Sequence, residues 1–114
     1  MATDDLLVRV RLIAAREGFS EKRMFGGNSF YLHGNMVCCV SKTGMMARVG
    51  KAQEEAALVR PGARPFTGTG RRMGGLVEVD LPHLEDDDTL EGWIAMALRN
   101  ARSLPPKEKD GVWV

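Results

Sequence analysis

The sequence has little net charge, few histidines and cysteines, and no long apolar run, and these shortages exclude several classes of protein. Sixteen Lys and Arg residues stand against fifteen Asp and Glu residues, so the formal net charge is only +1. Such a balance provides no overall field that attracts nucleic acid, a membrane surface or an acidic partner, although a local basic patch is compatible with it. No apolar stretch approaches the roughly 20 residues that a membrane-spanning helix needs. The N-terminal segment carries Asp4 and Asp5 and lacks a signal-peptide pattern, which predicts a cytoplasmic protein without membrane association.

The two cysteines predict neither a disulfide nor a metal site. Cys38 and Cys39 are adjacent in an expected strand, where neighbouring side chains point to opposite faces and are badly placed to pair. The sequence has no CxxC or Cys/His spacing of the kind that binds zinc. We therefore interpret both residues as small apolar side chains in a reducing compartment, and we expect neither a metal nor another cofactor.

The sequence contains no recognisable catalytic constellation. His33 and His83 are the only histidines, lie far apart in the chain and have no evident Ser or Cys partner for a triad. The acidic residues 85–88 are interpreted as charges at the start of a helix, with metal binding as the lesser alternative. Because no nucleophile–base pair can be named, we expect that the protein is not an enzyme.

The length of 114 residues suits one domain that buries a core without disulfide or metal staples. A first helix is expected over about 4–17, because apolar residues recur there at helical spacing. A strand is expected to begin at 24–25, to bend at Gly26-Gly27 and to resume over 29–32. A hairpin turn at Gly34-Asn35 would then lead into strands over 36–40 and 45–49.

The second half predicts a short helix, two further strands and a long amphipathic helix. The short helix covers 51–59 and ends before Pro61-Gly62, and a weak edge strand is expected near Pro65-Phe66. A strand follows over 76–81. Asp88 with Glu91 resembles a capping box for the last helix. The residues that should form its buried face are Leu90, Trp93, Ile94, Ala97, Leu98 and Ala101.

These elements predict an α+β fold of order α-β-β-β-α-β-β-α, with helices covering one face of a mainly antiparallel sheet. Pro105-Pro106 should terminate the last helix, which places a domain boundary after residue 104. We expect the domain to span 1–104 and a polar C-terminal tail to span 105–114. The chain contains no internal repeat and no second domain.

One ordered set of short motifs runs through most of the chain. It consists of Arg23-Met24-Phe25-Gly26-Gly27, Phe30-Tyr31-Leu32, Gly34, Ala47-Arg48-Val49, Pro65-Phe66, Met73, Val77-Glu78-Val79 and Trp93. In this order, over about residues 1–104, the motifs resemble the TfoX N-terminal domain family, which is named after a bacterial competence regulator. The resemblance implies a two-layer α-β(3)-α-β(2)-α fold of the type seen in secretion chaperones and YjbR-like proteins.

The chain departs from the family pattern in two ways that bear on function. Relatives often have aromatic residues where this chain has Gly74-Gly75, so a surface built from those aromatics is not expected here. TfoX itself also carries a second, C-terminal domain, whereas this chain stops after its last helix. We therefore do not expect the competence role to carry over as it stands.

The double glycine and the strand after it hold the first candidate site. Gly26-Gly27 is expected to be a bulge that bends the strand, with a backbone cradle for an anion or a partner's main chain as the alternative. Tyr31, His33 and Arg48 would share the sheet face opposite Phe30 and Leu32, if the register allows. Such a group would suit a carboxylate or phosphate ligand, and the plainer alternative is a solvated sheet face.

The glycine-rich segment 68–75 holds the second candidate site. It fits neither a dinucleotide-binding pattern nor a P-loop, so we expect a mobile basic loop. Arg71 and Arg72 make that loop the best candidate for contact with an anionic partner.

We therefore expect a non-catalytic regulatory module that acts through an unidentified protein partner. The resemblance implies regulation of the competence or transcription type. Self-association into a homodimer through an exposed sheet face or edge strand is compatible with this expectation. The alternative is a small-ligand or anion-binding module that uses Tyr31, His33, Arg48, Arg71 and Arg72. Direct nucleic-acid binding is not expected, because the chain is nearly neutral and lacks a recognisable reading motif.

Overall fold

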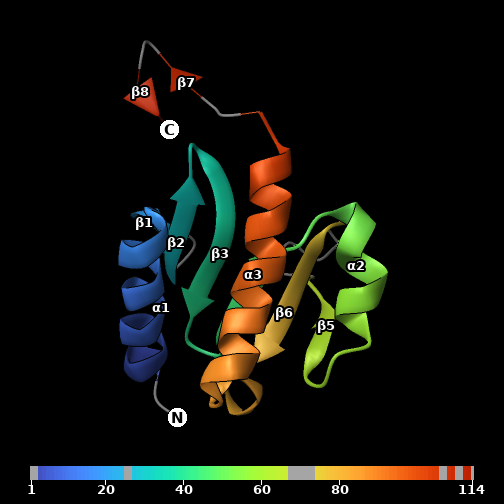
Figure 1. The fold of residues 1–114 in the computed structure, drawn as a ribbon. Helices are drawn as coiled ribbons and strands as arrows, with labels where there is room; N and C mark the ends of the chain where they lie inside the picture. Colours follow the sequence, from blue (N-terminus) through green and yellow to red (C-terminus); the bar gives the residue numbers. More distant parts are fainter. Residues whose placement is uncertain (1–2, 25–26, 67–73, 106–107, 110–111, 114) are drawn as a thin grey trace.

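The helices and strands follow one another in the order expected of an α+β fold (Figure 1). The computed structural model describes residues 3–24, 27–66, 74–105, 108–109 and 112–113. The first half contains α1 (Thr3–Glu17), β1 (Ser20–Met24), β2 (Gly27–Leu32), β3 (Asn35–Ser41) and β4 (Gly44–Arg48). The second half contains α2 (Lys51–Leu58), β5 (Ala63–Pro65), β6 (Leu76–Asp80), the 3-10 helix η1 (Leu81–Leu84) and α3 (Asp87–Ser103), followed by the short strands β7 (Glu108–Lys109) and β8 (Val112–Trp113).

The sheet is antiparallel throughout, with strand order β1-β2-β3-β4-β6-β5. Strands β1 to β4 form a meander of sequential neighbours. Helix α2 then carries the chain to the outer strand β5, and β6 returns between β4 and β5. Strands β7 and β8 pair only with each other, in a separate two-stranded sheet after α3. The α+β class is therefore confirmed, while the likeness to secretion chaperones and YjbR-like proteins stays a prediction.

One face of the sheet forms the core with all three helices. Cross-strand partners point to the same face, and one such row runs over all six strands. Its members are Glu21, Phe30, Cys38, Ala47, Val77 and Pro65. Phe30, Cys38, Ala47 and Val77 are fully buried there. The helices contribute Leu6, Val10, Ile13 and Ala14 from α1, Ala57 from α2, and the six expected apolar residues of α3.

The neighbouring row points to the other side of the sheet, which we call the second face. Its members are Lys22, Ser29, Cys39, Met46, Glu78 and Arg64. The row is charged at both edges and small or apolar in the middle. Arg64 pairs there with Glu78 at 2.8 Å, and Ser29 and Cys39 are buried. Two central residues of the second face are therefore shielded from solvent, whereas Met46 beside them is half-buried.

Two local predictions are corrected by the structure, and a third is not tested. Residues 20–24 form a separate edge strand, β1, where we expected a bent single strand. This strand was not expected because its polar sequence has no alternation of apolar residues. An irregularity in β2 lies between Phe30 and Tyr31, whereas the bulge expected at Gly26-Gly27 is not tested, because Gly26 lies outside the described residues. The N-cap of α3 is Asp86, whose carboxylate accepts from the backbone N–H of Thr89 at 2.9 Å, and Asp88 lies inside the helix.

None of the helices that the structure describes is long and apolar enough to cross a membrane.

Candidate functional site

The structure places two of the three expected residues, Tyr31 and Arg48, on the same face of the sheet. Tyr31 lies on the second face, since the ammonium of Lys22 lies 5.3 Å from the centre of its ring. Arg48 is two residues beyond Met46 in β4 and therefore points to the same face. Both side chains are half-buried, on the two strands that flank β3. This face therefore brings together an aromatic ring, a lysine and an arginine.

His33 does not lie in the strand where we expected it. It lies with Gly34 in the turn between β2 and β3, where their φ angles are 50° and 81°. Two successive positive φ angles define the tight hairpin turn that suits the twist of the strands. We expected Gly34-Asn35 to form this turn, but Asn35 is buried at the start of β3 and its amide donates to the carbonyl of Pro105 at 3.0 Å. The turn is therefore one residue earlier, and His33 is exposed at its tip.

Gly27 is the only described member of the double glycine. It begins β2 and lies opposite Met24 of β1. A Cβ at this position would overlap the backbone carbonyl of Val40 in β3, so the glycine allows two strands to approach closely. Gly26, Arg71 and Arg72 lie outside the described residues, and their binding roles stay predictions.

The two thiols lie inside the sheet, on opposite faces of β3. Cys38 and Cys39 are both free and buried. Burial raises the pKa of the Cys38 thiol well above its ordinary value, which suppresses the reactive thiolate. Within the described part of the chain, no three His, Cys, Asp or Glu side chains are placed to hold a metal ion.

The feature that sequence reasoning missed is a groove between α1 and α3. At the N-terminal ends of the two helices, a hollow of about 560 Å³ is lined by Asp5, Val8, Arg9, Glu85 and Asp87. A smaller hollow of about 250 Å³ continues along the same two helices, where Leu12, Ile13 and Leu90 supply apolar walls. Arg9 and Asp87 line both hollows. We refer to the two together as the α1–α3 groove.

Arg9 joins the two helices at the floor of the groove. Its guanidinium pairs with the carboxylate of Asp87 in α3 at 2.8 Å and donates to the carbonyl of Leu84 at 2.8 Å. The Arg9 side chain is only 20% exposed, whereas that of Asp87 is 85% exposed. The pair therefore fixes the spacing of the helices while leaving a carboxylate at the rim.

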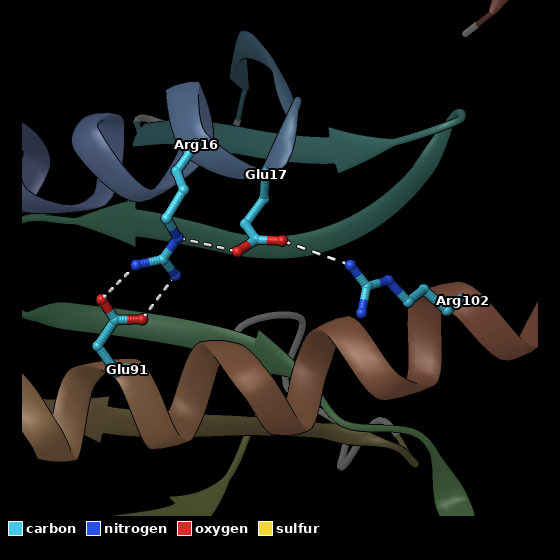
Figure 2. A network of polar contacts seen from close by, with 4 residues as sticks. All are labelled: Arg16, Glu17, Glu91 and Arg102. Atoms are coloured by element: carbon cyan, nitrogen blue, oxygen red, sulfur yellow. Dashed lines mark hydrogen bonds and ion pairs between the residues drawn. The ribbon is translucent and has the colours of Figure 1, made fainter.

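A second set of ion pairs closes the other end of the groove (Figure 2). Arg16 of α1 binds Glu91 of α3 with two hydrogen bonds of 2.8 and 2.9 Å. Glu17 accepts from Arg16 at 2.9 Å and from Arg102 at 3.4 Å. The hydrogen bonds from Arg16 lower the pKa of Glu91 below its ordinary value. Ion pairs between α1 and α3 therefore lie toward both ends of the groove, Arg9–Asp87 at one and Arg16–Glu91 at the other.

Val8 and Leu12 stand out on the wall of the groove because they are apolar and exposed. Their exposed fractions are 56% and 69%, and the third exposed large apolar residue of the described chain is Val59 at the end of α2. Val8 and Leu12 are four residues apart, so they lie side by side on one face of α1. The other apolar face of α1 is buried in the core, which means that this helix is apolar on two sides.

Comparison with known proteins identifies the family of this fold. The chain matches the TfoX N-terminal domain over residues 11–101 of its 114. It therefore belongs to the TfoX N-terminal domain family, as the motifs around Gly27 and Trp93 indicated. No curated protein and no solved structure matches the chain.

Proposed function

We propose that this protein is a non-catalytic, cytoplasmic regulatory module that binds a protein partner through the α1–α3 groove. The observation that supports the proposal most directly is the exposed pair Val8 and Leu12 on the groove wall. Exposed apolar side chains that adjoin one another and are rimmed by charge are typical of protein-binding surfaces. The membership of the TfoX N-terminal domain family supports regulation of the competence or transcription type.

The absence of catalysis is part of the same proposal. The thiols are buried, and the raised pKa of Cys38 keeps that side chain protonated. Free buried thiols are also typical of a reducing compartment, which supports the cytoplasmic location.

The charges at the rim define the kind of partner that the groove fits. Asp5, Glu85 and Asp87 surround its wider end, next to Val8. A partner segment with apolar side chains flanked by Lys or Arg would bury Val8 and Leu12 and meet these carboxylates at the edge. An amphipathic helix offers that pattern, because its apolar side chains recur at the spacing of Val8 and Leu12.

Quantitative capture from a lysate of the native cells tests this proposal. The immobilised full chain is compared with the double variant Val8→Gln/Leu12→Gln and with the control Val59→Gln, which removes an even more exposed apolar side chain elsewhere. We expect a saturable partner to be lost with the double variant and kept with the control. Retention by the double variant, or equal loss from both variants, would contradict the proposal.

Self-association through the same groove is the specific case in which the partner is a second copy. Light scattering across micromolar concentrations distinguishes it: a mass that rises with concentration and falls back in the Val8→Gln/Leu12→Gln variant supports a homodimer. A mass of one chain at every concentration removes that case.

A second candidate function, binding of a small anion, is favoured by the second face. Lys22 lies over Tyr31 there, and Arg48 points to the same side. The hydroxyl of Ser29 is buried on this face without a hydrogen-bond partner among the described residues. Titration with inorganic phosphate, followed by NMR shifts of these residues, tests it. Saturable shifts that Arg48→Gln abolishes support the candidate, and unchanged spectra at low salt contradict it.

A further inference from the structure

A cavity of mixed charge is lined by residues from the segment after α2, from the 3-10 helix η1 and from the first turns of α3. Its volume of about 520 Å³ is within the range of small-molecule sites. Arg60 and His83 stand on its walls, and carboxylates from Glu85, Asp86 and Asp88 stand around it. The cavity adjoins the α1–α3 groove, since Glu85 lines both, but Val8 and Leu12 do not line it.

Arg60 is fixed in this cavity by an aromatic ring. The central carbon of its guanidinium lies 5.2 Å from the ring centre of Trp93, which is itself only 1% exposed. Stacking of this kind holds the guanidinium plane and leaves its N–H groups at the edge. Within the described chain, no carboxylate or carbonyl accepts a hydrogen bond from the Arg60 side chain, so these donors point to a ligand or to water.

Two glycines shape the cavity around Arg60 and His83. Gly62 has a φ of 80°, and a Cβ there would overlap the imidazole ring of His83, so this ring packs directly on the glycine backbone. Gly92 lies inside α3, where glycine costs stability relative to alanine. A Cβ at Gly92 would lie 3.5 Å from a terminal guanidinium nitrogen of Arg60, which is ordinary contact. The backbone therefore does not require glycine at position 92, and its effect is to keep space beside the guanidinium.

Two carboxylates that line the cavity, those of Asp86 and Asp88, do not pair with Arg60. Asp86 accepts from the N–H and the hydroxyl of Thr89 as the cap of α3. Asp88 is exposed and forms no ion pair with Arg60 in the part of the chain that the structure describes. A ligand with only a negative charge would be repelled by these carboxylates, and a ligand with only a positive charge would be repelled by Arg60. A molecule that carries both charges can place its negative group beside Arg60 and its positive group beside the carboxylates.

From this arrangement we infer that the cavity binds a small zwitterion of the α-amino-acid class. The carboxylate of the ligand accepts from the N–H groups of Arg60, and its ammonium donates to the carboxylates on the α3 side, with Asp88 foremost. Pro61 and Pro82 supply rigid apolar walls, which favour an apolar side chain on the ligand. This inference does not rest on the proposed function, because the two sites share no apolar contact residue.

Isothermal titration of the full chain with L-leucine, isocaproate and isoamylamine tests the charge requirement. Isocaproate keeps the carboxylate and side chain of leucine without the ammonium, and isoamylamine keeps the ammonium without the carboxylate. We expect saturable binding of L-leucine and at least about tenfold weaker binding of each half-molecule, since each loses a charge-assisted hydrogen bond. Absence of saturable L-leucine binding, or equal binding of either half-molecule, would overturn the inference.

Variants at Arg60 locate the binding. Arg60→Gln should abolish detectable L-leucine binding, and Arg60→Lys should weaken it, because lysine keeps the charge but not the planar fork. Arg99→Gln, an exposed arginine of α3 outside the cavity, is the matched control and should bind as the unmodified chain does. Thermal unfolding verifies that each variant is folded. Unchanged binding in a folded Arg60→Gln variant would overturn the assignment.

Gly92→Ala separates a binding role from a structural one. Alanine should raise the unfolding midpoint by favouring the helix, while its methyl group, in ordinary contact with the Arg60 guanidinium, takes space that the ligand carboxylate would need and weakens L-leucine binding. Stability and binding should therefore change in opposite directions. If binding is unchanged or strengthened in the stabilised variant, the space at Gly92 serves no ligand. The Val8→Gln/Leu12→Gln variant should bind L-leucine normally, so the test of the cavity does not depend on whether the groove binds a partner.

Discussion

Gly27 lies directly against the backbone of Val40, the residue at which β3 passes the start of β2. A Cβ on Gly27 would overlap the Val40 carbonyl oxygen and would lie 3.3 Å from the sulfur of Cys39. The carbonyl belongs to a paired strand and cannot move aside as a flexible side chain can. The most recognisable motif of the sequence therefore serves the packing of two strands at this position.

Replacement of Gly27 by alanine should destabilise the protein by about 1–3 kcal/mol, the usual cost of overpacking an interior. Gly74→Ala is the matched control, because a Cβ there meets only the flexible side chains of Lys51 and Glu54. Urea denaturation of both variants measures the difference. Equal stability of the two would show that the close approach at Val40 is not a constraint.

Much of the fold could be predicted from periodicity, because burial imposes it. The apolar spacing from Leu90 to Ala101 and the alternation of Leu76 to Asp80 both matched the buried residues of the structure. Strand β1 could not be predicted in this way, since Ser20–Met24 is exposed along its length where the structure describes its side chains. An edge strand gains its position from pairing with β2 and carries charge in place of an apolar pattern.

Asp86→Ala should lower the stability by about 1 kcal/mol, because it removes the acceptor for the Thr89 N–H at the start of α3. Asp88→Ala should cost less, since Asp88 lies within the first turn and contributes only its charge. Asp86→Asn should retain most of the cap. Chemical denaturation of the three variants distinguishes the two positions. A larger loss of stability in Asp88→Ala than in Asp86→Ala would support the capping box that the sequence suggested.

The tie between Arg16 and Glu91 should make stability fall in acid. The hydrogen bonds from Arg16 lower the pKa of Glu91 in the folded protein, so its contribution is present above the unfolded value and is lost as pH falls through the lowered one. Glu91→Gln should therefore be slightly less stable than the unmodified chain at neutral pH, by the amount of an exposed ion pair, and this difference should be smaller near pH 3, about one unit below the ordinary pKa of glutamate.

Urea midpoints at the two pH values measure this effect, with Glu55→Gln on the exposed side of α2 as the control. The control should match the unmodified chain at both pH values. A Glu91→Gln difference that persists unchanged in acid would mean that packing, instead of charge, joins α1 to α3.

The domain boundary should fall one residue later than the proline pair suggested. The buried amide of Asn35 donates to the carbonyl of Pro105, so Pro105 belongs to the packed unit. A chain that ends after Pro105 should be as stable as the full chain. A chain that ends after Leu104 should lose about 1–3 kcal/mol, the cost of an unsatisfied buried donor. Circular dichroism melts compare the two, and equal midpoints would place the boundary at residue 104.

The candidate groove was beyond prediction because contacts distant in sequence create it. Arg9 and Asp87 are 78 residues apart, and nothing in their local sequence indicates that they meet. Helical spacing identified the buried face of α1 but not the exposure of Val8 and Leu12, which depends on where α3 lies. Conversely, the expected grouping of His33 with Tyr31 failed because a single-residue shift of the turn removed His33 from the strand.

Photo-crosslinking from the groove wall tests the central claim most directly. A benzophenone amino acid at position 12 would lie in the α1–α3 groove, and the same amino acid at position 59 would be at least as exposed on α2. Irradiation in native cells should give a discrete protein adduct from position 12 and none from position 59. An adduct of the same partner from position 59 alone, or no adduct from position 12, would contradict the account of the groove as the partner-binding surface.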